Sequence, residues 1–242
     1  MKDKIVVITG GATGMGLAIA KQLVQGNTVV SIDRTPAKIA ALRQALPAVH
    51  SLQADLTSSA DREHAVAAIE ARFGRIDLLI NNAGQGGAFD FIGSSEAELK
   101  ATIASQLAIN YEAPVLLTKR ALPLLQKSAA PTVVVSSTGL VYTPMAVVGT
   151  YCASKAAVHV ATMALRHQLA RLKIRVVEVL PPSVDTALNT AEGVAKMSPE
   201  RFATIFLKKL AQGGDVINIG QSAALEKISR LSPRLAFRML NR

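Results

Sequence analysis

The sequence predicts an α/β protein, a single domain built on a doubly wound parallel sheet of about seven strands with helices on both faces. Short apolar runs rich in Val, Ile and Leu alternate with segments of helical periodicity along the 242 residues. The early runs are continuous rather than alternating with polar residues, as in parallel strands that helices cover on both sides. No linker, repeat or low-complexity tract divides the chain, half of which is hydrophobic, so one large core is expected.

The expected elements alternate along the chain. Apolar runs predict strands at residues 4–9, 28–33, 50–54, 78–81, 132–136, 175–180 and 216–219. Periodic segments between them predict helices at residues 14–25, 36–46, 60–73, 96–127, 151–172 and 199–211. Strands joined in this order by helices predict right-handed crossovers and a parallel sheet.

Residues typical of helix starts support these boundaries. Ser198 precedes a proline, the order expected for an N-cap and the first helical position. Ser95 is followed three residues later by Glu98, which predicts a capping box. Pro114 lies inside the segment 96–127 and has no backbone N–H, so we expect a kink there rather than a break.

A glycine-rich turn, Thr-Gly-Gly-Ala-Thr-Gly-Met-Gly at residues 9–16, joins the first strand to the first helix. Glycines there permit a tight turn and let backbone N–H groups reach a pyrophosphate at the positive end of the helix. Between a strand and a helix, this turn predicts a Rossmann-like dinucleotide site. Its candidate contacts are Gly10, Thr13, Gly14, Met15 and Gly16.

Acidic residues follow the second and third strands. Asp33 lies 17 residues past Gly16, close to the spacing of the acid that binds an adenosine ribose. A carboxylate there repels a 2′-phosphate and favours NAD, whereas Arg34 beside it could bind that phosphate, so NADP stays open. Asp55, followed by Leu56, could bind the adenine amino group; the alternative is an ordinary solvated Asp at a strand end.

Tyr151 and Lys155 stand four residues apart in Tyr-Cys-Ala-Ser-Lys, so on a helix both side chains share one face. An ammonium group beside a phenol favours the phenolate. The spacing therefore predicts that Lys155 lowers the pKa of Tyr151 toward neutrality, as a general acid/base needs. Ser136 and Ser137 upstream and the glycine-rich turn strengthen the catalytic interpretation of this pair.

Together these motifs resemble the short-chain dehydrogenase/reductase family over nearly the whole chain. The matching segments, in family order, are residues 9–16, Asp55, Asn81-Asn82-Ala83-Gly84, Asn110, Ser136-Ser137, Tyr151-x-x-x-Lys155 and the stretch from Pro181 to Thr186. The resemblance implies an NAD(P)-dependent oxidoreductase that interconverts an alcohol and a carbonyl by hydride transfer. The alternative is a dinucleotide-binding redox sensor without turnover, which has no need of the four residues Asn110, Ser137, Tyr151 and Lys155.

The resemblance also implies roles for single residues. Tyr151 would exchange a proton with the substrate oxygen, while Lys155 would bind the nicotinamide ribose and lower the pKa of that tyrosine. Ser137 would bond the substrate oxygen, with Ser136 as the alternative one register away, and Asn110 would hold a water of the proton relay. Further cofactor contacts would come from Asn82, Ala83, Gly84, Pro181, Val184 and Thr186.

Three segments, 85–94, 140–148 and 183–212, are expected to form the substrate pocket, with 183–212 as its lid. Ligands of such sheets bind outside the carboxyl ends of the strands, where these segments lie. The family has a glycine where Pro182 stands, which predicts a reshaped backbone near the nicotinamide. Apolar side chains in these segments favour an apolar alcohol or ketone as substrate: Phe89, Phe91, Met145, Val147, Val148 and Leu188.

Residues 224–242 form a basic extension, in which Ser232-Pro233 is expected to start a last helix. Arginines recur there every four residues, at Arg234, Arg238 and Arg242, opposite Leu235, Met239 and Leu240. Such a helix can dock on its own domain or a partner subunit, or it can lie on an anionic membrane surface. This ending is similar to that of short-chain dehydrogenases associated with bacterial cell-envelope D-alanylation operons.

Composition narrows the remaining classes of function and location. The formal charge of +10 is spread along the chain without aromatic interleaving, so nucleic-acid binding is not expected. One cysteine, Cys152, excludes an internal disulfide, and neither a signal peptide nor a membrane-spanning helix is expected. A cytoplasmic protein is expected, peripheral to the inner membrane face if the tail binds lipid.

The remaining expectations concern metals and assembly. The four histidines lack metal-ligand spacing, so no metal site is predicted, and His159 is expected at a helix surface or an interface. The segments 96–127 and 151–172 carry more apolar positions than one buried face needs. They predict a subunit interface, and the family resemblance implies a homodimer or homotetramer.

Overall fold

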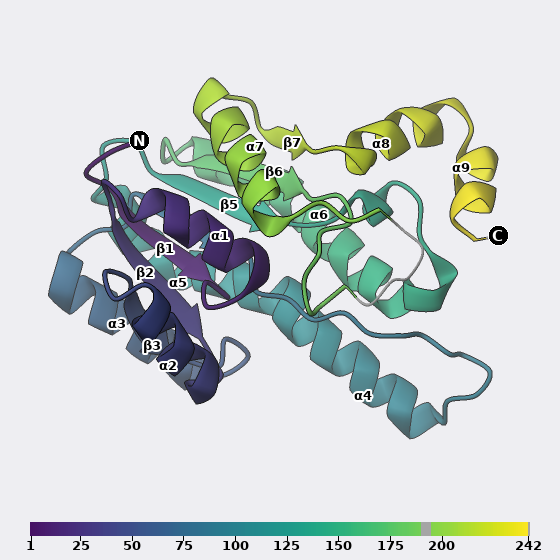
Figure 1. Cartoon of the computed structure of the whole chain (residues 1–242), viewed down its shortest axis with the longest axis horizontal. Helices are drawn as coiled ribbons and strands as arrows, with labels where there is room; N and C mark the ends of the chain where they lie inside the picture. The colour runs from purple at the N-terminus through teal and green to yellow at the C-terminus, as the bar shows by residue number, and fades with distance from the viewer. Residues whose placement is uncertain (190–194, 242) are drawn as a thin grey trace.

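The computed structural model describes residues 1–189 and 195–241, which form three layers around one parallel sheet (Figure 1). The sheet has seven strands in the order β3-β2-β1-β4-β5-β6-β7, and every pairing is parallel. The strands are β1 (Ile5–Thr9), β2 (Thr28–Asp33), β3 (His50–Gln53), β4 (Leu78–Asn81), β5 (Thr132–Ser136), β6 (Arg175–Leu180) and β7 (Val216–Asn218). The order reverses between β1 and β4, the switch point at which doubly wound sheets bind ligands.

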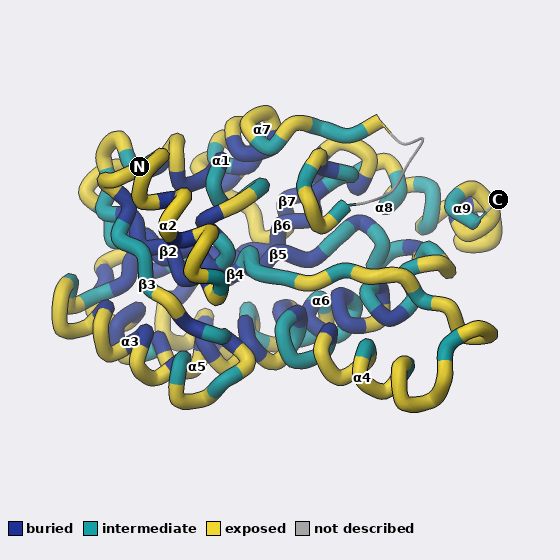
Figure 2. The backbone as a smooth tube through the Cα atoms, turned by 60° about the horizontal axis from the view of Figure 1, so that its bottom comes forward, coloured by how far each residue is buried: buried dark blue, intermediate teal, exposed yellow. Residues whose placement is uncertain are grey.

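Helices pack on both faces of the sheet, as predicted (Figure 2). One face is covered by α1 (Gly14–Leu23), α2 (Pro36–Ala45) and α7 (Pro199–Gln212). The other is covered by α3 (Ser59–Phe73), α5 (Ala113–Gln126) and α6 (Gly149–Ala170). The predicted α/β fold is therefore confirmed, with strand boundaries within one residue of those expected.

The core has one apolar layer on each side of the sheet. Val6 and Ile8 of β1 point into one layer and Val7 into the other, and all three side chains are buried. Because both faces are covered, every position of such a strand is apolar, which explains the continuous runs in the sequence. Phe202 and Phe206 of α7 stack 6.0 Å apart and are among the largest fully buried side chains.

The segment expected as one helix at 96–127 is three consecutive pieces. The first is α4 (Glu96–Leu107), which begins with the predicted Ser95–Glu98 capping box, and the last is α5. Between them the π-helical turn Ala108–Glu112 carries a bond from the backbone N–H of Ala113 to the Ala108 carbonyl, five residues back. Pro114 has no N–H to offer the carbonyl four residues before it, which accounts for the interruption just there.

The C-terminal extension contains one helix more than the sequence suggested. The expected last helix is α9 (Pro233–Leu240), capped by the Ser232 side chain, and α8 (Gln221–Leu231) precedes it. Both lie at the C-terminal end of the molecule in Figure 1. Arg242 lies outside the described residues. None of the helices in the described part of the chain is long and apolar enough to span a bilayer.

Candidate active site

The glycine-rich turn needs its glycines. Gly10 and Gly14 have φ values of +68° and +53°, a region that L side chains rarely adopt. A Cβ at Gly16 would collide with the Gly10 carbonyl oxygen, and one at Gly14 would come within 3.0 Å of Cγ2 of Thr186. Thr13 is the N-cap of α1, but its side chain caps no backbone N–H among the described residues. The first turn of α1 therefore presents N–H groups and a positive dipole end to an anion.

The end of β4 is tied to this turn by hydrogen bonds. Thr9 Oγ1 accepts from the backbone N–H groups of Asn82 and Ala83, at 2.9 and 3.0 Å. Asn82 Nδ2 donates to the Thr9 carbonyl at 3.1 Å. A Cβ at Gly84, the next residue, would lie 2.9 Å from Oδ1 of Asn110. The Asn-Ala-Gly motif thus joins the glycine-rich turn to the interrupted helix.

Asn110 sits in the π-helical turn and is only 1% exposed. Its Nδ2 donates to the Gln85 carbonyl at 2.8 Å and to Ser154 Oγ at 2.9 Å, while its Oδ1 accepts from the Gln85 N–H at 2.9 Å. The side chain therefore fixes the loop after β4 against α6. The backbone carbonyl of Asn110 has no α-helical hydrogen-bond donor, because the residue four positions later is Pro114, which has no N–H.

Tyr151 and Lys155 project from the first turns of α6 toward the end of β5. Lys155 is 4% exposed and its Nζ donates to the Ser136 carbonyl at 2.8 Å. The same nitrogen lies 6.0 Å from the centre of the Tyr151 ring. Ser137 is buried, and its Oγ makes no hydrogen bond with any described residue. The next side chain, Thr138, hydrogen-bonds the Tyr151 hydroxyl.

The expected effect of Lys155 on the pKa of Tyr151 is not found. Burial raises the pKa of Tyr151 to about 12, and the hydrogen bond with Thr138 only partly opposes this shift. Burial also lowers the pKa of Lys155 to about 8. Desolvation disfavours the charged form of both groups and is the largest cause of each shift. In this arrangement the tyrosine is a proton donor rather than a phenolate.

Asp33 is held inside the turn rather than exposed at the strand end. Its Oδ1 accepts from the backbone N–H of Ala12 at 3.2 Å and its Oδ2 accepts from Ser31 Oγ. Burial raises the pKa of Asp33, although these bonds oppose the shift. The Arg34 side chain is 72% exposed and pairs with Asp55 at 3.5 Å.

The other predicted cofactor residues are buried or half-buried. Leu56 is buried and its carbonyl accepts from Arg62 at 2.6 Å, whereas Met15 packs at the border of the core. The Pro181 carbonyl accepts from Ser222 Oγ at 2.6 Å, so the residue before Pro182 is anchored to α8. Val184 is buried, and Thr186 faces the glycine-rich turn through Gly14.

The family model described as short chain dehydrogenase matches residues 4–196. The chain belongs to the short-chain dehydrogenase family. It is 34% identical to DltE, an uncharacterised oxidoreductase of Bacillus subtilis, over all of this chain and 98% of that protein. The predicted resemblance to the dehydrogenases of D-alanylation operons thus extends over the whole chain, and the protein is an oxidoreductase.

Solved structures share the same fold at lower identity. A short-chain dehydrogenase from Burkholderia cenocepacia in complex with NADP has a TM-score of 0.86 and 21% identity, covering 99% of this chain and 98% of its own. A 3-ketoacyl-(acyl-carrier-protein) reductase from Brucella melitensis complexed with NADH has a TM-score of 0.80 and 24% identity, covering 90% and 97%.

The three segments expected to form the substrate pocket contact one another. The Phe89 N–H donates to the Val147 carbonyl at 2.8 Å, and Leu188 packs against Gly86. Two of the expected lining residues, Phe91 and Val147, are 72% and 64% exposed. Residues 190–194 of the expected lid lie outside the described part.

Sequence reasoning missed several residues of the dehydrogenase site. Thr138, Ser154 and Gln85 contact the predicted residues, but no motif distinguishes such single polar positions. His159, expected at a helix surface or an interface, is 25% exposed and pairs with Glu178, a fully buried residue of β6. The one available signal was the Glu inside the otherwise apolar run at residues 176–180.

Proposed function

We propose that this short-chain dehydrogenase interconverts an alcohol and a carbonyl with NAD(P), using Tyr151 as the general acid/base. One observation supports the proposal above the others. The buried Ser137 Oγ has no partner among the described residues and adjoins the Thr138–Tyr151 pair beside Lys155. A buried hydroxyl without a partner costs about 1–3 kcal/mol, and a substrate oxygen would satisfy it.

The chain's own residues then perform the proton chemistry. The nicotinamide, when bound, supplies or accepts the hydride. In carbonyl reduction the Ser137 hydroxyl donates a hydrogen bond to the substrate oxygen as it gains charge, and Tyr151 gives that oxygen its proton. Lys155 binds the ribose hydroxyls, and the Asn110 backbone carbonyl holds the water from which the proton is replaced. Because burial keeps Tyr151 protonated, the arrangement suits reduction.

The experiment that tests this function follows NADH and NADPH oxidation against a panel of carbonyl compounds. Apolar ketones and aldehydes are expected to be reduced faster than small charged keto acids. Binding of NADH without turnover of any compound would favour the alternative, a redox sensor. Faster turnover of the charged compounds would overturn the apolar substrate class instead.

Asp33→Asn is expected to relax the preference for NAD over NADP. The amide keeps an acceptor for the Ala12 N–H but removes the negative charge that would repel a 2′-phosphate. The dissociation constant of NADPH should fall about tenfold relative to that of NADH. Fluorescence titration of both cofactors measures it; an unchanged ratio would contradict the assignment of Asp33.

A homodimer or homotetramer is part of the proposal. Large apolar side chains remain exposed on the helices expected at an interface: Ile103 on α4, Leu116 on α5, and Val160 and Met163 on α6. Light scattering of the full chain measures the assembly, and a monomer at micromolar concentration would contradict it.

For the C-terminal extension we propose docking on the domain rather than on a membrane. Asn241 Nδ2 donates to the Pro144 carbonyl at 3.1 Å, and Asn241 Oδ1 accepts from the Ala146 N–H at 2.6 Å. These bonds support a role in bracing the substrate segment 140–148. The full chain and an Arg234→Glu/Arg238→Glu variant should float equally poorly with anionic liposomes. Charge-dependent recovery would support the membrane alternative.

A further inference from the structure

A fully buried carboxylate, Glu178, contacts the helix that bears Lys155, and the proposed chemistry does not use it. Glu178 is in β6, 0% exposed, with Val135 of β5 and Val216 of β7 as its neighbours in the sheet. Both of its carboxylate oxygens lie 2.9 Å from Nδ1 of His159. Burying a carboxylate costs several kcal/mol unless its charge is compensated. A role beyond packing would account for its presence.

Helix α6 carries both the lysine and the histidine that contacts the carboxylate. Tyr151, Lys155 and His159 are spaced four residues apart, so they share one face of α6. Glu178 reaches that face through His159. Lys155 Nζ binds the Ser136 carbonyl, and Ser136 pairs in the sheet with the residue after Glu178. Burial lowers the pKa of Lys155 to about 8, and the charge of Glu178 opposes that shift.

Few other titratable groups face Glu178 in the described structure. His159 and Lys155 come from α6, and Tyr142 comes from the segment after β5, with its ring 6.3 Å from that of His159. The Tyr142 hydroxyl bonds Asn218, which also donates to a carboxylate of α8 at 2.6 Å. That carboxylate, on Glu226, is paired with Arg230 at 2.7 Å.

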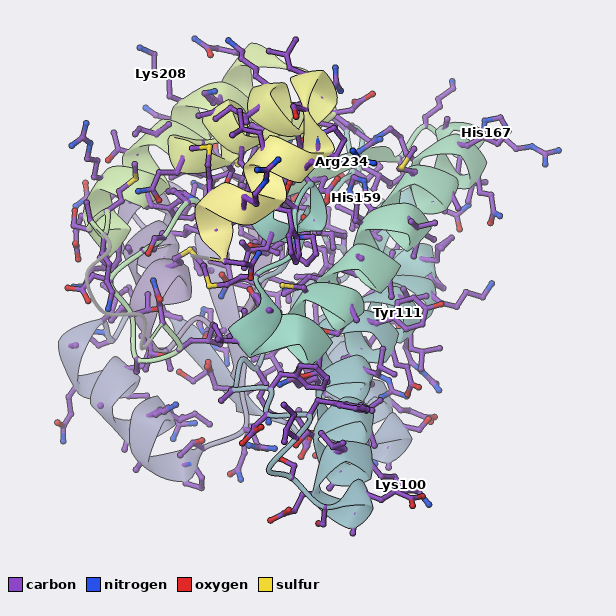
Figure 3. All side chains as sticks on the ribbon, turned by 90° about the vertical axis from the view of Figure 1, so that its right-hand side faces the viewer. Lys100, Tyr111, His159, His167, Lys208 and Arg234 are labelled. Atoms are coloured by element: carbon purple, nitrogen blue, oxygen red, sulfur yellow. The ribbon has the colours of Figure 1, made fainter. Side chains whose placement is uncertain are left out.

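We propose that Glu178 is a positioning residue for Lys155: its buried negative charge, anchored by His159, keeps the lysine in its ammonium form. A carboxylate only accepts hydrogen bonds, so Nδ1 of His159 carries the proton between them. His159 is 25% exposed and lies on the side of the molecule where the C-terminal helices are seen (Figure 3). The inference rests on the proposed function, in which the ammonium form binds the cofactor ribose.

The direct test measures the titration of Lys155 by NMR of the lysine side chains, with Lys155→Met assigning the signal. In the wild type the midpoint is expected near pH 8. Glu178→Gln is close in shape and can still accept from His159, but it carries no charge. Its midpoint should fall by about one pH unit or more. This readout needs no substrate, so it remains decisive even if the proposed oxidoreduction fails.

Two substitutions of His159 separate charge from packing. His159→Gln retains a donor for Glu178, so the Lys155 midpoint should stay near that of the wild type. His159→Ala leaves the carboxylate buried without its partner, which favours the neutral acid, so the midpoint should fall as in Glu178→Gln. If Glu178→Gln does not fold, the Lys155 midpoint in His159→Ala tests the proposal in its place.

Activity gives an independent readout. The alkaline limb of the kcat/KM profile should move to lower pH in Glu178→Gln, and kcat/KM should recover as the pH is lowered. If Glu178 had a purely structural role, the substitution would lower kcat/KM at every pH. Glu226→Gln, the control on α8, should leave both the limb and the Lys155 midpoint unchanged. Unchanged midpoints in both Glu178→Gln and His159→Ala would overturn the proposal, as would an equal shift in Glu226→Gln.

Discussion

Tyr151→Phe is expected to lower kcat by about a thousandfold while the dissociation constant of NADH stays unchanged. The substitution removes only the hydroxyl, so the ring still packs above Lys155, whose nitrogen lies 6.0 Å from its centre. Lys155 keeps its bond to the Ser136 carbonyl and remains placed for the cofactor. The proposed reaction, however, loses the group that would protonate the substrate oxygen. Stopped-flow kinetics and cofactor titration measure the two effects separately.

Tyr111→Phe is the matched control, since it removes the same atom from a tyrosine on the π-helical turn next to Asn110. Figure 3 shows Tyr111 on the face toward the viewer. Its kcat should match that of the wild type. Turnover retained by Tyr151→Phe would remove the catalytic assignment, and loss of both turnover and NADH binding would assign Tyr151 a structural role instead.

The shifted pKa values of Tyr151 and Lys155 affect stability in opposite directions. The pKa of Tyr151 is raised from 10.0 to about 12, so between these values the folded state binds the proton that the unfolded chain has lost. Its contribution is present below pH 10 and lost as the pH rises toward 12. The pKa of Lys155 is lowered from 10.5 to about 8, so its contribution rises with pH across that window.

Local patterns in the sequence were sufficient for the fold. The apolar run at 78–81 and the helix starts at Ser95 and Ser198 depend on short-range chemistry, and the structure has them in place. The glycine-rich turn was equally readable, because Gly10, Gly14 and Gly16 are each required by a positive φ or a close backbone approach.

The features that the sequence did not predict depend on burial by segments that are distant in the chain. The protonation of Tyr151 is set by desolvation, and four-residue spacing from Lys155 carries no information about that. The partner of Glu178 is nineteen positions away in the chain, so the buried His159–Glu178 pair has no local motif. The additional C-terminal helix, α8, which precedes α9, was not predicted because the sequence interpretation centred on the arginine repeat of α9.

Ser137→Ala should separate function from stability. Ser137 Oγ is buried and has no hydrogen-bond partner among the described residues, so the fold gains nothing from it. Removing the hydroxyl should leave the free energy of unfolding unchanged or raise it by about 1 kcal/mol. If this hydroxyl bonds the substrate oxygen, the same change should lower kcat by about 10²–10³-fold. Urea titration and steady-state kinetics measure the two outcomes.

Ser136→Ala is the matched control and also tests the alternative register. Lys155 binds the backbone carbonyl of Ser136, which the substitution keeps, so activity should stay close to that of the wild type. A loss of kcat in Ser136→Ala but not in Ser137→Ala would move the substrate contact one residue back. A fall in the free energy of unfolding of Ser137→Ala would show that the hydroxyl stabilises the fold, which contradicts this prediction. Natural proteins retain a destabilising polar group where function requires it, so stability gained together with activity lost would identify Ser137 as a functional residue.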